Sequence, residues 1–433
     1  MQKKILAAAV LAGLMAPAAA FAEGYGIIEH HAEGVAMGGA AMFIENDAGN
    51  MAYNPAGITL CEGEQVKASA TYISPHGWAK GVSLADVLAG NTKGSNWGKN
   101  VVHPAWAPGT YYVRKVGEKE WYGLGCYSRF GNMSEFPAGG WAATNNRFAK
   151  MNGLSITPTY ARQSGRKFFW AVGADINYVG LELQKDYTAI PGTSGAMGTN
   201  KTEGDTWALG WNMGLRYAPT AKDEVGFAYH SKIAHTMDAD FDAYALVLMD
   251  NPPGYSSPYF HTKAHGKVTL PDSYHFGYSH KFDDKNRVEI GAIRTQWHNF
   301  KSLLMNFDKP YLKGATQALS IHNWQDTWRY AIGYEHKFSK KYTGMIGFAF
   351  DESGIPYDGG QFMVPIGVRR TYSIGGKYTD KRHTIALTLG WQVEGDHSFK
   401  GYTPASSGTD GYVSATSYDN IAKIFSIGYT YHF

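Results

Sequence analysis

Few side chains in this 433-residue sequence are spaced like the groups of an enzyme. The motif G-x-S-x-G, which presents a serine nucleophile in many hydrolases, does not occur, and neither does the phosphate-binding motif G-x-x-x-x-G-K-[ST]. The 16 histidines are scattered, and two metal-like spacings, His30-His31 and His261-x-x-x-His265, lie in a non-strand segment and in a loop region. We therefore expect no enzyme, no metal site and no cofactor.

The first 22 residues have the organisation of a secretory signal peptide. Lys3 and Lys4 precede an apolar run from 5 to 15, and Ala20-Phe21-Ala22 offers a small-residue cleavage site. The mature chain is expected to begin at Glu23, in an exported and oxidising compartment. Beyond the signal, no apolar run approaches the roughly 18 residues of a membrane helix.

The composition favours membrane-spanning strands. The chain has 29 Tyr, 21 Phe, 12 Trp and 52 Gly, yet its mean hydropathy is slightly negative at -0.32. Abundant aromatics without continuous hydrophobicity suit strands with one apolar and one polar face. The 40 basic and 37 acidic residues are spread without blocks, so nothing indicates nucleic acid. Cys61 and Cys126 are the two cysteines; the compartment permits a disulfide between them, but two cysteines make no framework.

Alternation of apolar and polar residues dominates from about residue 64 to the end. Between 207 and 217 every second residue is large and apolar, and the others are small or polar; the pattern recurs at 328–338 and 384–394. A small, polar face suits a crowded wet lumen, and an aromatic face suits lipid. We predict an all-β, antiparallel transmembrane barrel of about fourteen strands, at 64–74, 105–116, 120–130, 151–163, 168–186, 205–218, 222–236, 263–281, 286–300, 323–338, 341–351, 367–379, 382–395 and 421–433.

The connections alternate between short turns and long loops. Short turns on one rim and long loops on the other are typical of an outer-membrane barrel, and an even strand number puts both chain ends at the periplasmic rim. The chain also ends on an alternating strand with a terminal aromatic, Phe433, which resembles the assembly signal of such barrels. The predicted loops are 75–104, 131–150, 187–204, 237–262, 301–322, 352–366 and 396–420.

Residues 23–63 precede the first strand and alternate poorly. Their stretch NDAGNMAYNPAGIT, residues 46–59, is too broken by Gly, Asn and Pro for a long helix, and Asn46 or Asp47 can cap a short one. Small residues suit compact packing inside a tube. We therefore expect a signal peptide at 1–22, an N-terminal plug at 23–63 and a barrel at 64–433.

At these residues the chain resembles the FadL family of outer-membrane long-chain fatty-acid transporters, whose hatch carries a D-A-G-N…N-P-A sequence. The matching residues here are Asp47-Ala48-Gly49-Asn50 and Asn54-Pro55-Ala56, and the resemblance continues mainly through 24–136 and the C-terminus. It implies a monomeric multi-pass channel in the outer membrane of a Gram-negative bacterium, surrounded by lipid and lipopolysaccharide. Its ligand would be a long-chain fatty acid or another hydrophobic small molecule.

The resemblance also implies a route for the ligand. Capture would use loop 237–262, where FDAYALVLM could form a short apolar helix that exposes Phe241, Tyr244, Leu246 and Leu248. An apolar lumen pocket would contain Tyr25. Lateral release would follow a kink of the third strand near Gly131-Asn132-Met133, since Gly admits unusual dihedrals. The plug residues would be Asp47, Asn50, Asn54, Pro55 and Ala56, with the Asn54 side chain hydrogen-bonded to the wall.

Three basic residues, Arg216, Arg329 and Lys377, fall on the lumen face of the predicted strands, where they could pair with a ligand carboxylate or with lumen acids. Three alternatives to a fatty-acid channel stay open. The family also resembles channels for toluene-like aromatics, which this sequence does not distinguish from fatty-acid channels. A non-selective porin would need an open lumen, which a plug would close. An outer-membrane lipase would need the nucleophile motif that is missing.

Overall fold

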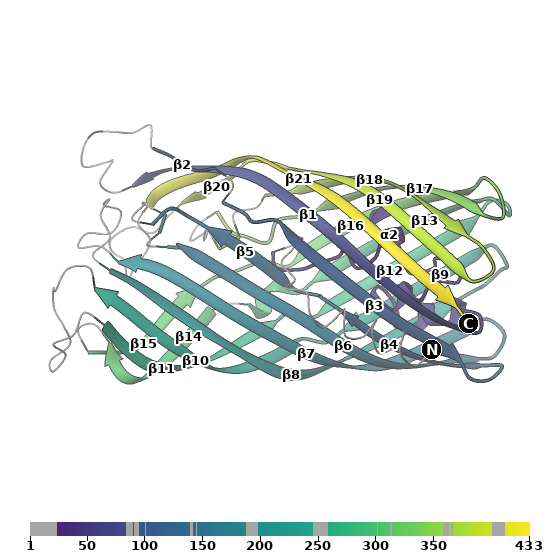
Figure 1. The fold of residues 1–433 in the computed structure, drawn as a ribbon, viewed down its shortest axis with the longest axis horizontal. Coiled ribbons are helices and arrows are strands. Elements are labelled where there is room, and N and C mark those ends of the chain that lie inside the picture. The colour runs from purple at the N-terminus through teal and green to yellow at the C-terminus, as the bar shows by residue number, and fades with distance from the viewer. Residues whose placement is uncertain are drawn as a thin grey trace.

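The chain forms one closed antiparallel β-barrel, which extends along the longest axis of the molecule (Figure 1). The computed structural model describes residues 24–83, 90, 95–99, 101–138, 142–143, 145–187, 198–245, 259–300, 302–311, 314–357, 363–364, 367–400 and 412–433. The first strand, β1 (Glu64–Ser83), pairs with β3 on one side and with the last strand, β21 (Tyr412–His432), on the other. The sheet therefore closes on itself and leaves no free edge at this seam.

Twenty-one strand segments in the described residues merge into fourteen wall strands, as predicted. Where a wall strand is broken, consecutive segments share a neighbour: β4 and β5 both pair with β6. Segment β2 is an addition beside the outer part of β1. The remaining segments are β2 (Ser95–Lys99), β3 (Ala105–Lys115), β4 (Glu120–Tyr127), β5 (Gly131–Glu135), β6 (Phe148–Ser164), β7 (Phe168–Tyr187), β8 (Gly198–Tyr217), β9 (Asp223–His230), β10 (Ile233–Ala245), β11 (Tyr259–Leu270), β12 (Ser273–Lys281), β13 (Asn286–Thr295), β14 (Ser302–Tyr311), β15 (Ala315–Ile321), β16 (Thr327–Lys337), β17 (Tyr342–Asp351), β18 (Arg369–Thr379), β19 (His383–Glu394) and β20 (His397–Lys400).

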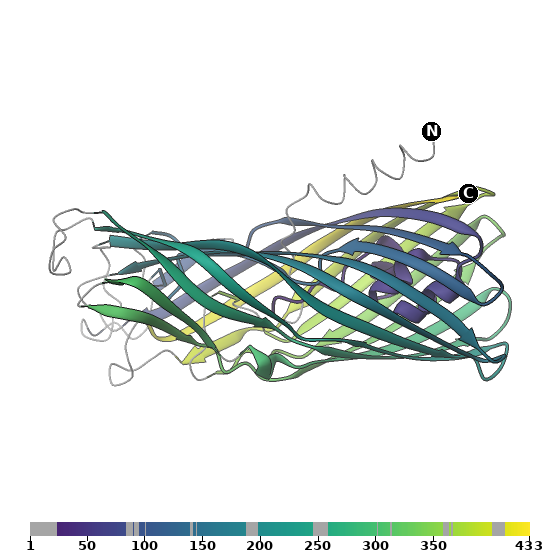
Figure 2. The ribbon, with the colours of Figure 1, turned by 90° about the horizontal axis from the view of Figure 1, so that it is seen from below.

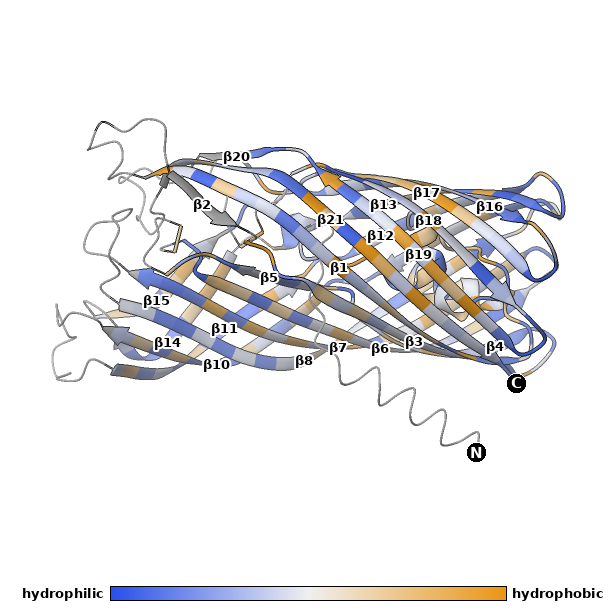
Figure 3. Ribbon diagram, turned by 45° about the horizontal axis from the view of Figure 1, so that its top comes forward, coloured by the Kyte–Doolittle hydropathy of each residue, from blue (hydrophilic) through white to orange (hydrophobic). Residues whose placement is uncertain are grey.

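The two faces of the wall differ as the alternation predicted. Along β19, Leu387 and Leu389 are exposed on the outside, whereas Ala386 and Thr388, which alternate with them, are buried on the inside. Figure 3 shows the resulting banding of apolar and polar residues on β19 and β21. An apolar outer belt around a small, polar interior is the pattern of a barrel surrounded by hydrocarbon.

Residues 24–63 lie inside the barrel, near the rim where the chain ends (Figure 2). They form one short α-helix, α2 (Ala32–Ala36), and two 3₁₀ helices, η1 (Ala48–Ala52) and η2 (Pro55–Leu60). Wall glycines make room for them: a Cβ on Gly347 would lie 2.2 Å from the Gly38 nitrogen, and one on Gly214 would lie 2.2 Å from Asn54 Oδ1. The small residues of the lumen face are therefore explained by close packing against this segment.

Several strands extend further than predicted, so parts of the predicted loops are wrong. The interval 237–262 begins and ends as strand rather than as a short helix, because β10 continues to Ala245 and β11 starts at Tyr259. Likewise β14 and β15 occupy most of 301–322. The reason is that the outward side chains change from apolar to charged, as in Asp238 and Asp240, while the inward ones stay apolar. A search for apolar outward faces does not recognise such strands.

Three further expectations concern the ends and the cysteines. The predicted signal peptide, 1–22, lies outside the described residues, as do Leu246 and Leu248. Cys61 and Cys126 are buried free thiols. Among the described residues no helix is both long and apolar enough to span a membrane. The one remaining short helix, η3 (Trp297–Asn299), follows β13.

Candidate functional site

A buried group of charges joins the N-terminal segment to the wall. Lys67 Nζ, on β1, donates to Asp47 Oδ2 at 2.7 Å and to the Glu33 carboxylate. His31 Nδ1 lies 3.3 Å from Glu33 Oε2, and all four side chains are nearly inaccessible to solvent. His31, Glu33 and Asp47 lie close enough together to share a metal ion, a grouping that the sequence analysis missed. The Lys67 ammonium binds both carboxylates, so the group is an ion-pair network.

The protonation of Glu33 follows from this network. Burial alone raises the pKa of its carboxyl, but the Lys67 ammonium and the His31 imidazole outweigh burial and hold that pKa well below its usual value. Glu33 therefore stays ionised at neutral pH, and the wall lysine keeps a charged partner in the N-terminal segment.

The D-A-G-N…N-P-A residues build two consecutive capped turns. Asp47 caps η1, where its Oδ1 accepts from Gly49 N at 2.7 Å, and Asn54 caps η2, where its Oδ1 accepts from Ala56 N at 3.0 Å. Pro55 occupies the first position of η2, which suits its fixed φ. Asn50 bonds back to Ile44 through both its amide atoms, at 3.2 and 2.7 Å. The motif therefore stabilises the local turns and short helices of this segment.

Asn54 also connects that turn to the barrel. Its Nδ2 donates to the Leu215 carbonyl on β8 at 3.0 Å. Asn54→Ala removes the cap and this bond, and we expect it to loosen the segment by about 1–3 kcal/mol while the barrel still assembles. Ligand uptake by cells, at equal surface level of variant and parent, checks this. Asn286→Ala, at the start of β13, removes side-chain hydrogen bonds that do not involve the segment and is the control. Equal uptake by all three proteins would contradict the expectation.

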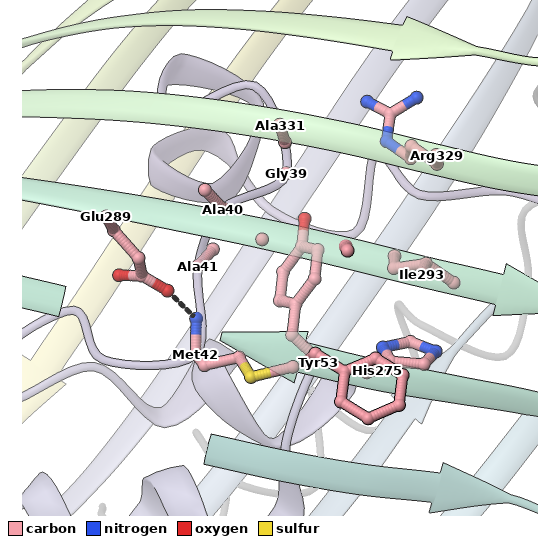
Figure 4. Close-up of a pocket in the computed structure, with 13 residues that line it drawn as sticks. Gly39, Ala40, Ala41, Met42, Tyr53, His275, Glu289, Ile293, Arg329 and Ala331 are labelled. Carbon is pink, nitrogen blue, oxygen red and sulfur yellow. Dashed lines mark hydrogen bonds between the residues drawn. The ribbon is translucent and has the colours of Figure 1, made fainter. Parts of the chain in front are cut away.

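Further contacts fix the middle of the segment against the wall. Met42 N donates to Glu289 Oε1 on β13 at 2.6 Å, and Tyr53 lies beside this contact (Figure 4). Arg329 Nη2, on β16, donates to the Gly38 carbonyl at 3.0 Å. The segment is thus held by several wall strands, and the described residues enclose only a small cavity of about 10 Å³ here.

The third wall strand is broken at residues 128–130, between β4 and β5. The break lies directly before Gly131-Asn132-Met133, near which it was predicted, and these residues themselves begin β5 and pair with β6. Gly131 does not have a positive φ, so glycine geometry is not the cause. Instead, the N-terminal residues pair with the break: Ile27 N donates to the Arg129 carbonyl and Gly131 N to the Tyr25 carbonyl, both at 2.8 Å. The chain's own N-terminus satisfies these backbone groups.

Tyr25 lies in an aromatic box directly inside this break. It is 1% exposed. Its ring stacks on Trp324 at 5.2 Å and meets Phe300 edge-on at 5.4 Å between centroids. Burial raises the pKa of its phenol, which stays neutral. The surroundings of Tyr25, where the sequence predicted an apolar pocket, are thus aromatic, but the sequence analysis missed its neighbours Trp297, Phe300 and Trp324. The sequence signal that could have revealed these neighbours is the loss of strand alternation at 296–300 (QWHNF) and 322–324 (HNW).

In the extracellular part of the barrel, apolar side chains that face the lumen extend the apolar surroundings of Tyr25. Phe241, predicted on an exposed loop, lies on β10 and is buried, with Phe307 at 4.7 Å and Tyr311 at 4.8 Å between ring centroids. Tyr244 is exposed at the end of β10. One continuous cluster of buried apolar side chains contains both Phe241 and Tyr25.

The predicted lumen cations face inward, and each has a protein partner. Arg216 Nε donates to Glu224 at 2.6 Å, and its Nη1 donates to Thr59 in η2 at 3.2 Å. Arg329 binds the Asp351 carboxylate. Lys377 Nζ lies 3.7 Å from Glu335 Oε2. These cations hold the lumen and its N-terminal segment together, which is one of the two outcomes expected from the sequence.

Beside the broken strand lies a polar chamber that sequence reasoning did not find. Arg129, in the break, pairs with Asp175 on β7 at 2.6 Å. With His30, His230 and His275 it lines a cavity of about 40 Å³. The His230 and His275 rings are 4.9 Å apart. The chamber brings together residues distant in sequence, so only the fold reveals it.

His30 makes the N-terminal segment sensitive to acid. It is buried between Tyr53 and Tyr127, and burial, followed by His31, His275 and Arg129, lowers its pKa well below the usual value of about 6.5. A released imidazole would bind a proton that the buried one excludes. Below about pH 6.5 we therefore expect release of the segment to become easier by up to about tenfold per pH unit.

Limited proteolysis of the N-terminal segment across this pH range measures the effect. His30→Phe keeps a ring between Tyr53 and Tyr127 but cannot be protonated, so we expect a flatter pH dependence for this variant. The same pH dependence in His30→Phe and parent would show that His30 is not the responsible group.

Comparisons with known proteins agree with this architecture. A family model described as "Outer membrane protein transport protein (OMPP1/FadL/TodX)" matches residues 11–433. A long-chain fatty acid transport protein of Escherichia coli is 24% identical over 360 residues, which cover 77% of this chain and 78% of that protein.

Solved structures show the same fold. A Pseudomonas aeruginosa FadL homologue superposes with a TM-score of 0.80 at 17% identity, covering 95% of this chain and 100% of that chain. The Ralstonia pickettii toluene transporter TbuX has a TM-score of 0.66 at 18% identity and covers 95% and 99%.

Proposed function

Because this chain belongs to the outer membrane protein transport family (OMPP1/FadL/TodX), a family of outer-membrane β-barrel transporters of hydrophobic compounds, we propose that it takes up long-chain fatty acids passively. In this proposal the ligand enters at the outer end, moves along the apolar inner surface to Tyr25, and leaves sideways into the membrane at the break of the third strand. The segment 24–63 acts as a plug that closes the lumen to water and ions.

One observation carries the proposal: a single cluster of buried apolar side chains extends from the extracellular part of the wall to the broken strand. Strand β14 supplies its middle, because Leu303 and Phe307 point inward and Tyr311 follows at its outer end. Phe300 then leads to Tyr25. A strand advances about 3.3 Å per residue, so β14 alone covers roughly 30 Å, the scale of an extended alkyl chain rather than of a single ring.

Movement of the ligand along this route needs no energy source. Each methylene group that leaves water gains about 0.8 kcal/mol, so an apolar surface extracts a long chain from dilute solution. Sideways release lets the chain pass from protein to lipid without entering water again.

In this proposal the first residues of the plug move to open the exit. The residues that pair with the break, Tyr25 to Ile27, are held there by two backbone hydrogen bonds, whereas the rest of the segment is fixed by Lys67, Asn54 and Glu289. Movement of the first few residues alone would open the wall at residues 128–130 and keep the lumen closed. One barrel contains the whole route, so the unit of function is a monomer.

A second candidate is uptake of monoaromatic hydrocarbons. The box around Tyr25 is built of aromatic rings, which suit a small aromatic ligand, and the structural neighbour from Ralstonia pickettii is a toluene transporter. The apolar surface above the box has no role for so small a ligand, which is why we place this candidate second.

Uptake in cells distinguishes the two. Gram-negative cells that lack their own fatty-acid channel are supplied with this protein and given labelled oleate or labelled toluene. Protein-dependent oleate uptake supports the proposal, whereas uptake of toluene alone moves the substrate to small hydrocarbons. Large steady ion conductance of the purified barrel in planar bilayers would contradict the closed plug.

A further inference from the structure

A groove lies on the lipid-facing side of the barrel wall, far from the lumen route. It has a volume of about 630 Å³ and runs across β16 to β19. Exposed Ile346, Ile374 and Leu387 form its apolar sides, and Tyr342 and Tyr378 stand at its end near the short turns.

Two glycines make the hollow. Gly344 on β17 lies directly opposite Gly376 on β18, so two adjacent wall strands lack an outward side chain at the same level. The Phe338 ring covers Gly344, since it lies 2.8 Å from a Cβ built there. Around a Cβ built on Gly376, by contrast, the nearest atom is the Thr343 carbonyl oxygen at 3.5 Å, which leaves ordinary contact space. The space is therefore available for a larger group, and nothing in the packing requires glycine at 376.

Positive charge gathers at the end of the groove. Thr379 N donates to the Lys341 carbonyl at 2.8 Å, which places the β16–β17 and β18–β19 turns side by side. Together these turns expose Lys340, Lys341, Lys381 and Arg382. The acid between them, Asp380, accepts backbone hydrogen bonds from Arg382 at 2.9 Å and from His383 at 3.0 Å, so it serves the turn itself.

We propose that this groove binds an anionic glycerophospholipid of the periplasmic leaflet. The short turns mark the periplasmic rim, and the paired Tyr342 and Tyr378 lie where aromatic residues meet the lipid headgroups. One acyl chain lies on Gly376, beside the Phe338 ring and between the branched side chains, which replaces a void in the lipid packing with contact. The headgroup phosphate meets the lysines of the two turns.

Native mass spectrometry of the purified barrel tests this with dipalmitoyl phosphatidylglycerol as probe and phosphatidylcholine as comparison. Gly376→Leu fills the groove, and we expect it to remove the bound lipid. Lys340→Gln combined with Lys341→Gln keeps the groove, and we expect phosphatidylglycerol to bind about tenfold more weakly. The parent is expected to prefer phosphatidylglycerol.

Matched controls separate the groove from general effects. Ala174→Leu adds the same side chain to the lipid-facing side of β7, and Lys285→Gln removes a charge from another short turn. Both are expected to retain the lipid, and heat-dependent gel mobility verifies that every barrel is folded. Equal lipid binding by Gly376→Leu and Ala174→Leu would overturn the proposal. It would also be overturned if the parent bound phosphatidylglycerol no better than phosphatidylcholine, or if the double lysine variant bound phosphatidylglycerol as well as the parent does.

Discussion

A Gly26→Cys/Phe130→Cys variant is expected to lose oleate uptake when oxidised and to regain it when reduced. These residues form an isolated antiparallel bridge in which the hydrogen bonds come from the neighbours on each side, Ile27 and Gly131. Their Cα atoms are therefore expected at about 4.5 Å, within the range that a disulfide needs. The cross-link would hold the N-terminus on the broken strand, so the proposed exit could not open. Cys61 and Cys126 are first replaced by alanine, which removes the native thiols.

The control has the same local geometry at a second isolated bridge, between Val102 and Ser134. There His103 N donates to the Met133 carbonyl and Glu135 N to the Val101 carbonyl. A Val102→Cys/Ser134→Cys cross-link leaves the N-terminus free to move, and we expect uptake to continue. Full uptake through the oxidised first variant, with complete cross-linking verified by peptide mass, would refute exit at the break. It would leave the family assignment untouched.

Lys67→Met is expected to have the largest effect on the plug. The substitution keeps an unbranched side chain but removes the charge, so Glu33 and Asp47 remain buried as carboxylates without their cation. Breaking a buried pair in this way costs about 3–5 kcal/mol. We expect the segment to detach and the empty lumen to conduct ions, which single-channel recording in planar bilayers measures directly. The wall strands keep their pairing, so the barrel should still assemble.

Lys337→Met is the matched control. Lys337 also reaches the segment from the wall, since its Nζ lies 2.5 Å from Glu45 Oε2, but both side chains are substantially exposed, 37% and 51%. An exposed pair contributes about 0–1 kcal/mol, so conductance should stay close to that of the parent. If Lys67→Met were as silent as Lys337→Met, the buried charges would not be what retains the plug.

The sequence by itself determined the barrel and its lining. Strict alternation along β8, β16 and β19 makes one face apolar, and such strands satisfy their backbone groups in lipid only by closing into a barrel. The cap at Asp47 was also readable, because a short polar side chain before small residues acts on the nearest backbone N–H groups. Both signals are local: the alternation repeats every two residues, and the capping side chain bonds to a backbone N–H two residues further along the chain.

The tertiary structure decided everything that depends on distant residues. Lys67 looks like an ordinary lumen cation until β1 brings it to Glu33 and Asp47. The aromatic box joins Tyr25 to Trp324, some three hundred residues later in the chain. At 128–130 the backbone of the broken third strand pairs with residues 25–27, about a hundred residues earlier in the chain, and no pattern within the strand encodes this contact. Local periodicity thus determines which face of a strand meets lipid, but a site built across a closed barrel depends on register and closure, which only the folded chain establishes.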